Sequence, residues 1–555
     1  MRTLLERHRG WLDGAIAAIA SRAHFAPFTE SPGRRHHPPG AKQAGRAAFE
    51  ARLGRPFPLR LPGEVRRVGA EISPYTGAPL GIDYPGVSVG PLYAAMHVAW
   101  PQWAAAGPAV RVGVCLEILH QLHQATFENA FATMHTAGQG FLLAFAGSGA
   151  SSLDRGLEGL AHAHEAMSRI PSHATYSRRF GPGEPVVLAK RYRIKPVGIT
   201  VVLSCGTYPA WNAYPAIFAS LATGNPVVIK PHPEAILPMA IAVETGRAVL
   251  LEAGFDPNLL TLAADTRADP ITWSLLDHPD TAIIDFTGSQ RFGALIEARC
   301  RHAQVYTETA GCNAVVVEST DDPEAMFAAI AHGLCAFSGQ MCTTAQNIFV
   351  PADGVRHGSA RILPDAFERR LIAAVEETLA RPGAAGLCGT IQSPAILSTV
   401  THLAESHPQA VLRASGPIPQ AGYPAARTAT PLILRGDIAD RSLYGQEHFG
   451  PISFVIAAPS REAALHRAAE DARQHGAIAC YAYSTDADFC DQIEDAFADA
   501  GASVGINLRR QLPINYTAGY SDFHVTGLNP AGNACLTDIA FVARRFRVVQ
   551  SKREL

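Results

Sequence analysis

The sequence predicts an α/β protein whose parallel sheet carries helices on both faces. From residue 184 onward, short apolar stretches alternate with longer stretches of helical periodicity. This alternation is typical of a sheet covered by crossover helices. The chain also has 555 residues. Because that is too long for one hydrophobic core, we expect two or three domains.

Composition and charge exclude several classes of protein. Apolar residues make up 47% of the chain and charged residues 17%, as in globular rather than disordered proteins. The net charge of −2 does not indicate nucleic acid or an acidic membrane surface as a partner. The N-terminus, MRTLLERHRG, lacks the apolar core of a secretory signal. No apolar run reaches the length of a membrane span.

The cysteine and histidine patterns predict no metal site. The 10 cysteines are scattered without a CxxC pair, which indicates neither zinc binding nor a disulfide framework. His120, His123 and His135 share a predicted helix without an evident third ligand. HAHEAM (162–167) departs from the HExxH pattern because Ser168 holds the place of the second histidine. We therefore expect a protein of the reducing cytoplasm.

The N-terminal part of the chain gives the weakest pattern. Leu4 to Ala20 predicts an amphipathic helix, and 31–40 predicts a linker rich in Pro and Gly, whose adjacent histidines we expect to be solvated. Helices are then predicted near 89–105 and 109–137, the second from apolar residues at helical spacing.

Regular alternation of strands and helices begins near residue 198. The predicted strands are 198–205, 226–230, 259–263, 282–286 and 304–308, and the predicted helices are 209–222, 235–252 and 290–301. This pattern predicts a Rossmann-like nucleotide domain, although the GxGxxG fingerprint is absent. In the second half we predict a strand at 314–318, helices at 323–336 and 364–380, an irregular segment at 508–532 and a last strand at 543–550.

A single thiol, Cys342, stands in the stretch FSGQMCTTAQN (337–347). Its small and polar neighbours suit a turn that presents a side chain to a cavity. The thiolate is the strongest nucleophile among ordinary side chains and attacks carbonyl carbons readily. A cysteine can equally be a small buried hydrophobe, so the interpretation depends on the surrounding motifs.

Those motifs resemble the aldehyde dehydrogenase family. Glu308 in YTETAGCN lies 34 residues before Cys342 (342 − 308 = 34), the family's spacing between general base and thiol. LATGNPVVIKP carries Lys230, FTGSQRFG carries Gly288 and Ser289, and EHFGP carries Glu447 and Phe449. All stand in the family's order. Each motif alone is weak evidence, whereas the ordered set is a strong indication.

The resemblance implies an aldehyde dehydrogenase-like fold with a small β ribbon for oligomerisation. We expect an N-terminal extension over 1–60 and a nucleotide-binding domain over 61–173 and 196–309. We expect a catalytic domain over 310–512 and an oligomerisation and C-terminal segment over 174–195 and 513–555. A homodimer or homotetramer is the expected assembly.

The resemblance also implies roles at the site. Cys342 attacks the aldehyde to give a thiohemiacetal and then a thioester, which water activated by Glu308 hydrolyses. Ser289 is expected to cap the helix at 290–301, where free N–H groups suit a pyrophosphate. Lys230, Gly288, Ser289, Glu447 and Phe449 are expected to bind NADP or NAD.

Two positions depart from the family pattern. Pro233 replaces a glutamate that NAD-preferring members often carry, and Glu234 stands one position away. This loss of a repulsive charge favours NADP. The oxyanion donor is the second departure, because Thr207 holds the place of the usual asparagine. Ungapped spacing favours the Thr207 hydroxyl, while Asn212 stays an alternative.

Three segments, 134–145, 205–225 and 521–538, look most like the PaaN-type aldehyde dehydrogenases of phenylacetate catabolism. This resemblance implies a CoA-linked semialdehyde as substrate. No hydratase segment follows Leu555, so we expect ring opening to need a separate protein. The alternatives are a CoA-acylating aldehyde dehydrogenase and an inactive cofactor-binding structural protein.

Overall fold

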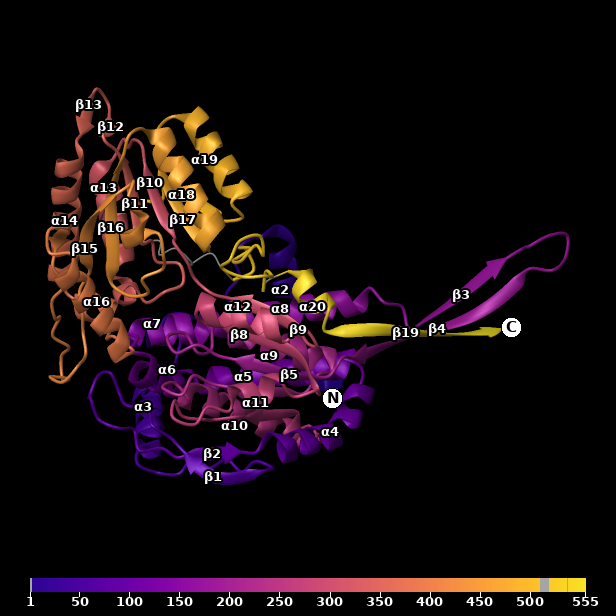
Figure 1. Cartoon of the computed structure of the whole chain (residues 1–555). Helices are drawn as coiled ribbons and strands as arrows, with labels where there is room; N and C mark the ends of the chain where they lie inside the picture. The colour runs from indigo at the N-terminus through magenta and orange to yellow at the C-terminus, as the bar shows by residue number, and fades with distance from the viewer. Residues whose placement is uncertain (1, 510–518, 537) are drawn as a thin grey trace.

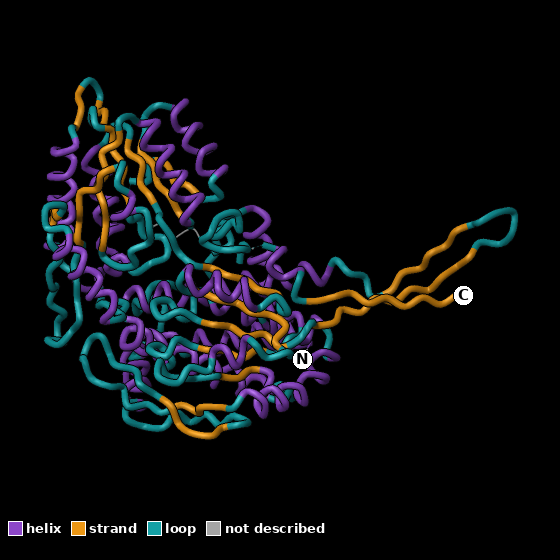
Figure 2. Tube along the Cα trace, in the orientation of Figure 1, coloured by secondary structure: helices purple, strands orange, loops and turns teal. Residues whose placement is uncertain are grey.

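The computed structural model describes residues 2–509, 519–536 and 538–555. Figure 1 shows two lobes, each built on one large sheet, and an arm that projects away from them. Figure 2 shows helices around the strands of both lobes. The predicted α/β class is therefore confirmed. Within the described residues, no helix combines the length and apolar character needed to cross a membrane.

The first lobe is built on a five-stranded sheet in the order β7-β6-β5-β8-β9. Every neighbouring pair in it is parallel. Its strands are β5 (Ile199–Leu203), β6 (Val227–Lys230), β7 (Leu260–Leu262), β8 (Thr281–Thr287) and β9 (Gln304–Glu308). Because the strands are parallel, their carboxyl ends share one edge, where open α/β sheets bind ligands.

Helices pack on this sheet through one continuous apolar core. The core includes N-terminal residues such as Leu12 and Phe49, so the predicted extension is an integral part of this lobe. The elements before the sheet are α1 (Arg2–Arg7), α2 (Arg9–Ser21), α3 (Ala41–Arg52), β1 (Glu64–Val68), β2 (Tyr84–Val87), α4 (Val89–Ala105), α5 (Pro108–Gln124), α6 (Thr126–Ala137), α7 (Phe141–Phe145), the π-helical turn η1 (Ala146–Ser151) and α8 (Ser152–Ser168). Those within it are α9 (Ala213–Thr223), α10 (Leu237–Glu252), the 3₁₀ turn η2 (Pro257–Leu259), α11 (Thr272–Leu276) and α12 (Gln290–Arg299).

Some predicted helix bounds are wrong for local reasons. The helix predicted over 109–137 is divided at Ala125, where Thr126 Oγ1 donates to the His123 carbonyl at 2.7 Å and competes with the backbone ladder. The N-terminal helix is likewise divided at His8. The last strand begins at Phe546 because Asp538 caps a short helix, α20 (Ile539–Ala543), in front of it.

The second lobe is built on a seven-stranded sheet in the order β14-β15-β16-β11-β10-β17-β18, parallel except for β14. Alternate residues of its strands enter separate cores, Val316 and Phe349 on one face and Val315 and Ile348 on the other. This follows from the two-residue period of a strand. The strands are β10 (Ala314–Val317), β11 (Asn347–Pro351), β14 (Val411–Arg413), β15 (Leu432–Asp437), β16 (Ile452–Ala458), β17 (Ala479–Tyr483) and β18 (Ser503–Ile506).

Helices cover both faces of this second sheet, and a small hairpin lies beside it (Figure 1). They are α13 (Pro323–Cys335), the short turn η3 (Ala336–Gly339), α14 (Pro364–Ala380), α15 (Ala384–Cys388), α16 (Pro394–Ser406), α17 (Arg441–Tyr444), α18 (Arg461–His475) and α19 (Ala487–Asp499), and the hairpin is β12 (Val355–His357) with β13 (Ala360–Ile362).

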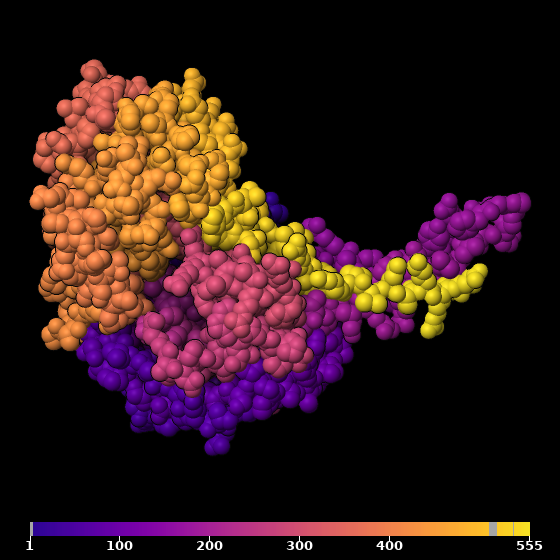
Figure 3. Space-filling model, in the orientation of Figure 1, coloured from indigo at the N-terminus to yellow at the C-terminus, as the bar shows by residue number. Residues whose placement is uncertain are grey.

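The projecting arm is a three-stranded antiparallel sheet in the order β19-β4-β3. Its strands are β3 (His173–Arg178), β4 (Val186–Pro196) and β19 (Phe546–Glu554). Figure 3 shows it standing free of the body. The ribbon predicted over 174–195, joined by the final strand, is therefore present.

The C-terminal segment returns to the first sheet before it enters the arm. Thr309 N donates to the Ala531 carbonyl at 2.7 Å, and Asn533 N donates to the Thr307 carbonyl at 3.1 Å. These bonds attach residues 529–533 to the end of β9. The segment predicted to be irregular lies here, apart from residues 510–518, which lie outside the described part of the chain.

Candidate active site

A cavity of about 1450 Å³ is lined by residues of both lobes. Of the predicted site residues, it is lined by Thr207, Lys230, Pro233, Gly288, Ser289, Cys342, Glu447 and Phe449. Glu308 lies just behind this wall, 1% exposed, with its carboxylate beside the thiol of Cys342. The structure thus gathers residues that are far apart in the sequence around one cavity.

The turn before Cys342 is held in an unusual conformation. Phe337 and Ser338 have positive φ values of 49° and 48°, which are costly for residues other than glycine. The Ser338 hydroxyl donates to the Cys388 and Ala429 carbonyls at 3.1 and 2.9 Å. At Gly339 (φ 67°) a Cβ would lie 2.3 Å from the Gly450 carbonyl oxygen, so only glycine fits.

Two amide side chains complete the support of the nucleophile loop. Gln340 donates to the Phe337 and Thr390 carbonyls at 3.1 and 2.9 Å. Asn313 donates to the Cys342 carbonyl at 2.7 Å, and its own amide oxygen accepts from the backbone of β17 and the residue before it. The sequence prediction of a turn that presents a thiol is consistent with this geometry.

The Cys342 thiol is only partly exposed, and its pKa is raised well above the ordinary value. Burial is the main cause, and the nearby Glu308 carboxylate is the second. The free thiol is therefore poorly ionised at neutral pH, and its reaction needs a proton acceptor.

Glu308 ends β9 and is fixed by two neighbours. Asn212 Nδ2 donates to Glu308 Oε1 at 2.8 Å, and His524 Nε2 lies 3.2 Å from the same oxygen. Among the described residues, Glu308 Oε2 has no hydrogen-bond partner. This oxygen is therefore both buried and unpaired.

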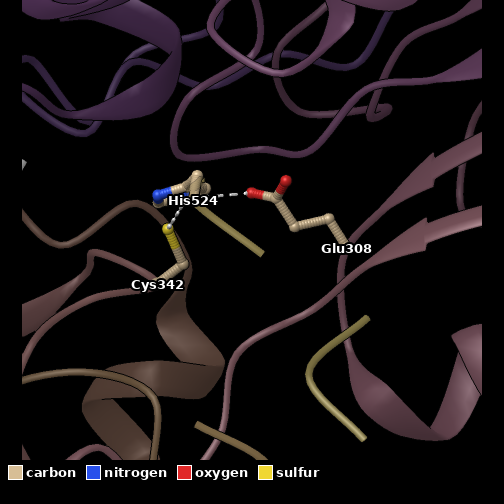
Figure 4. A group of neighbouring side chains, drawn as sticks. All are labelled: Glu308, Cys342 and His524. Carbon is tan, nitrogen blue, oxygen red and sulfur yellow. Dashed lines mark hydrogen bonds and ion pairs between the residues drawn. The ribbon is translucent and has the colours of Figure 1, made fainter. Parts of the chain in front are cut away.

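His524 is a site residue that the sequence analysis did not identify. Its Nε2 lies 4.0 Å from Cys342 Sγ, so the imidazole stands between thiol and carboxylate (Figure 4). It comes 182 residues after Cys342, from the segment in which the sequence showed only a resemblance to one subfamily. Proximity in the fold, rather than any sequence spacing, reveals it.

The two candidate oxyanion donors differ in their contacts. Thr207 lines the cavity, and its carbonyl accepts from Gln139 at 2.7 Å. Asn212 also lines the cavity, but its amide donates to Glu308. Within the described residues, no hydrogen bond joins Thr207 to Cys342 or Glu308. The role of Thr207 as oxyanion donor stays a prediction. Asn212, the alternative donor, is hydrogen-bonded to Glu308.

The cofactor residues form a second cluster around the carboxyl edge of the first sheet. Lys230 is 7% exposed, and its Nζ lies 2.8 Å from Asp265 Oδ1. Burial lowers the pKa of Lys230, which the Asp265 carboxylate partly offsets. Ser289 occupies the N-cap position of α12, but its side chain makes no capping hydrogen bond, contrary to expectation.

Pro233 lines the cavity, and the next residue, Glu234, is paired with Arg267. Glu234 Oε1 accepts from Arg267 Nε at 2.7 Å, and Oε2 accepts from Gln392 at 3.2 Å. Burial acts to raise the pKa of Glu234, but Arg267 holds it below the usual value. Burial lowers the pKa of His232 to about 4, so this ring is neutral at pH 7.

The N-terminal part contributes a wall that the sequence did not predict. His24, Phe25, Ala26 and Glu30 line the same cavity. The expectation for the adjacent histidines of the linker is confirmed for His36, which is exposed. It is wrong for His37, whose ring packs against Phe127 at 4.8 Å because the linker folds back onto α6.

Residues 82–520 match the model of the aldehyde dehydrogenase family. The chain belongs to this family. A crystal structure of an NAD-dependent aldehyde dehydrogenase from Burkholderia multivorans is 44% identical, with a TM-score of 0.97 over 100% of this chain and 99% of that one.

This aldehyde dehydrogenase is also similar to curated relatives. It is 27% identical over 274 residues to an α-ketoglutarate semialdehyde dehydrogenase of Haloferax volcanii, a match over 48% of this chain and 53% of the relative. The chain thus spans about half of that protein. A vanillin dehydrogenase of Pseudomonas fluorescens is 27% identical over 380 residues, which cover 68% of this chain and 73% of the relative.

Proposed function

We propose that this enzyme oxidises an aldehyde to a carboxylic acid with NAD or NADP. The observation that carries the proposal is the convergence of Cys342 and Glu308, whose reactive atoms lie within 4.8 Å beside a cavity of both lobes. A thiol nucleophile next to a buried carboxylate is the pair that thioester formation and hydrolysis require.

The chain's own residues account for the acyl chemistry. The thiolate of Cys342 attacks the aldehyde carbon, and the carbonyl oxygen becomes the thiohemiacetal oxyanion. The backbone N–H of Cys342 and a side-chain donor, Thr207 or Asn212, stabilise this charge. After hydride loss leaves a thioester, Glu308 takes a proton from water as the water attacks. The carbon–sulfur bond breaks, and the acid leaves.

The cofactor residues fit a nicotinamide dinucleotide, which accepts the hydride when bound. Gly288 and Ser289 line the cavity at the start of α12, and this helix N-terminus carries no side-chain cap, as suits a pyrophosphate site. Lys230 offers a buried amine for the adenosine ribose, and Glu447 with Phe449 offers contacts for the nicotinamide ribose. The similar protein from Burkholderia multivorans is described as NAD-dependent.

For the substrate, we propose a CoA-linked semialdehyde of aromatic catabolism, from the resemblance to PaaN-type enzymes. The relatives that act on vanillin and on a semialdehyde support the wider class. The test is a panel of aldehydes, free and CoA-linked, with NAD and NADP, in which reduced nicotinamide is followed. Turnover of free aldehydes alone would reject the CoA-linked substrate, and no turnover at all would favour a structural cofactor-binding protein.

A CoA-acylating reaction is the second candidate. The intact Glu308 beside Cys342 argues against it, because a carboxylate that activates water serves hydrolysis. A turnover rate that depends on added free CoA, with a CoA thioester as product, would support this alternative instead.

We also propose a cytoplasmic homo-oligomer, a dimer or a tetramer. The free cysteines suit a reducing compartment. The arm exposes Val548 and Val549 by 42% and 55%, as a strand edge awaiting a second copy would. Cofactor binding is assigned to 61–173 with 196–309, and the acyl chemistry to 310–512. Sedimentation or light scattering tests the assembly.

A further inference from the structure

A buried imidazole lies between the two groups of the proposed acyl chemistry. His524 Nε2 is 4.0 Å from Cys342 Sγ and 3.2 Å from Glu308 Oε1. His524 is 4% exposed and Glu308 is 1% exposed. Figure 4 shows dashed contacts from His524 to both side chains. One nitrogen atom is therefore within reach of both the thiol proton and the carboxylate.

The ring is held in this position from one side by Trp211. The two rings meet edge to face, with centroids 4.8 Å apart. Trp211 Nε1 donates to Ser151 Oγ at 3.1 Å, and the guanidinium of Arg155 lies 4.1 Å from the Trp211 ring. The indole is thus fixed by its own neighbours, and it limits the rotation of the imidazole.

The N-terminal part of the chain holds the same segment from another side. Phe25 packs edge to face on Tyr520 at 5.3 Å, and Arg22 lies over the ring of Phe523 at 3.9 Å. Further along, residues 529–533 are hydrogen-bonded to the end of β9, which carries Glu308. The segment that carries His524 is therefore held by contacts on both sides of this residue. Such support is needed to keep a functional side chain in a precise position.

A positive charge at His524 Nε2 would offset the negative charges of an ionised Cys342 and of Glu308. Ionisation of Cys342 would place a thiolate beside the Glu308 carboxylate in a buried site, and both burial and Glu308 oppose it. An imidazolium between them is attracted to both. Glu447 and Cys205 also act on the Cys342 thiol and disfavour its ionisation. Arg155 lies behind the indole of Trp211, and Asp522 stands two residues before His524 in the same segment.

We propose that His524 is the proton acceptor for Cys342, an inference that rests on the proposed function. The S–H bond of Cys342 breaks, an N–H bond forms at His524 Nε2, and the imidazolium is hydrogen-bonded to Glu308 Oε1. The thiolate then attacks the aldehyde. When the thioester is hydrolysed, the imidazolium returns the proton to the leaving thiolate, while the Glu308 carboxylate takes a proton of the attacking water. Glu308 then releases this proton to solvent, so the thiol, the imidazole and the carboxylate all return to their starting states.

The test measures alkylation of Cys342 in the full-length enzyme without aldehyde or cofactor. Iodoacetamide is added at a series of pH values, and the rate of labelling is followed on the peptide that contains Cys342. We expect His524→Asn to lower the rate at pH 7 by roughly 10²-fold, the lower range for general-base catalysis. The variant should approach the wild-type rate at high pH, where hydroxide removes the thiol proton.

Two further variants separate proton transfer from structure. Added imidazole should restore alkylation in His524→Ala, and His402→Asn, at an exposed histidine of α16, should behave as wild type. A His524→Asn profile identical to wild type would overturn the proposal. A rate lowered equally at all pH values would also overturn it, because it indicates a structural role. The labelling assay contains no aldehyde, so its result does not depend on whether the enzyme oxidises aldehydes. A failure of the aldehyde panel would contradict the proposed function without deciding the role of His524.

Discussion

Two clusters of side chains at one cavity differ in where their residues lie in the sequence. The cofactor cluster, Lys230, Glu234, Asp265 and Arg267, follows the carboxyl ends of two adjacent strands, β6 and β7. Its charges are paired locally, Lys230 with Asp265 and Glu234 with Arg267. The thiol cluster, Asn212, Glu308, Cys342 and His524, comes from four separate segments.

The two clusters should therefore respond differently to substitution. A local cluster built on one rigid sheet keeps its geometry when one member changes. In the thiol cluster each group acts on its neighbour, so a single change affects at least one step of the reaction. We therefore expect substitutions in the thiol cluster to lower the turnover rate strongly, and those in the cofactor cluster to change cofactor choice.

Cys342→Ala should have the largest effect. Without the thiol no acyl intermediate forms, so we expect steady-state oxidation to fall to trace levels while NAD and NADP still bind. The measurement is turnover together with cofactor binding by fluorescence quenching. Cys205→Ala, at a second thiol lining the cavity, is the matched control and should stay active. Substantial turnover in Cys342→Ala would exclude this residue as the nucleophile.

Glu308→Gln should stall the second half of the reaction. Gln cannot take a proton from water, so we expect a burst of reduced cofactor and then steady turnover lowered roughly 10²- to 10⁴-fold. Rapid mixing with aldehyde and cofactor measures the burst. If the burst is lost while cofactor binding is unchanged, Glu308 is needed for thiol attack as well.

The same difference explains what could be predicted from the sequence. Lys230, Ser289 and Glu308 each follow or end a strand of a parallel sheet, so a contiguous motif also fixes a place at the binding edge. Helix 364–380 and strand 304–308 were predicted with the observed bounds, the helix because its apolar residues recur at helical spacing. His524 follows no periodic element, and only the return of the C-terminal segment to β9 brings it to the thiol.

Local side chains account for the other differences. The Thr126 hydroxyl and the Asp538 cap each altered an element boundary that apolar periodicity alone did not mark. The cavity wall formed by Phe25 and Glu30 was missed for a different reason. Residues that pack onto a distant segment carry no signal in their own local pattern.

A smaller effect is expected when the charge balance of the cofactor cluster is changed. Arg267→Ala leaves the Glu234 carboxylate unpaired, and that charge repels the 2′-phosphate of NADP. We expect the ratio of kcat/KM for NADP to that for NAD to fall roughly tenfold, as for a partly exposed charge pair. Glu234→Gln should raise the ratio, and Pro233→Glu should lower it. The same assay tests the prediction that the wild-type enzyme prefers NADP. Unchanged ratios in all three variants would show that residues outside this cluster discriminate between the cofactors.

The smallest effect concerns Glu447, whose pKa burial raises to about 7. The folded protein therefore keeps a proton that the unfolded chain releases near 4.5. The stability contributed by this carboxyl is complete below pH 4.5 and is lost as the pH rises through about 7, by at most about 3 kcal/mol.

Glu447→Gln removes this dependence, because a neutral amide stays uncharged at every pH. We expect the variant without cofactor to gain a few degrees in Tm over wild type at pH 8 and little at pH 5. Thermal unfolding at the two pH values measures the difference, and Glu252→Gln, at an exposed position, is the control. An equal difference at both pH values would show that Glu447 is already ionised in the folded enzyme, with its charge balanced like those of Lys230 and Glu234.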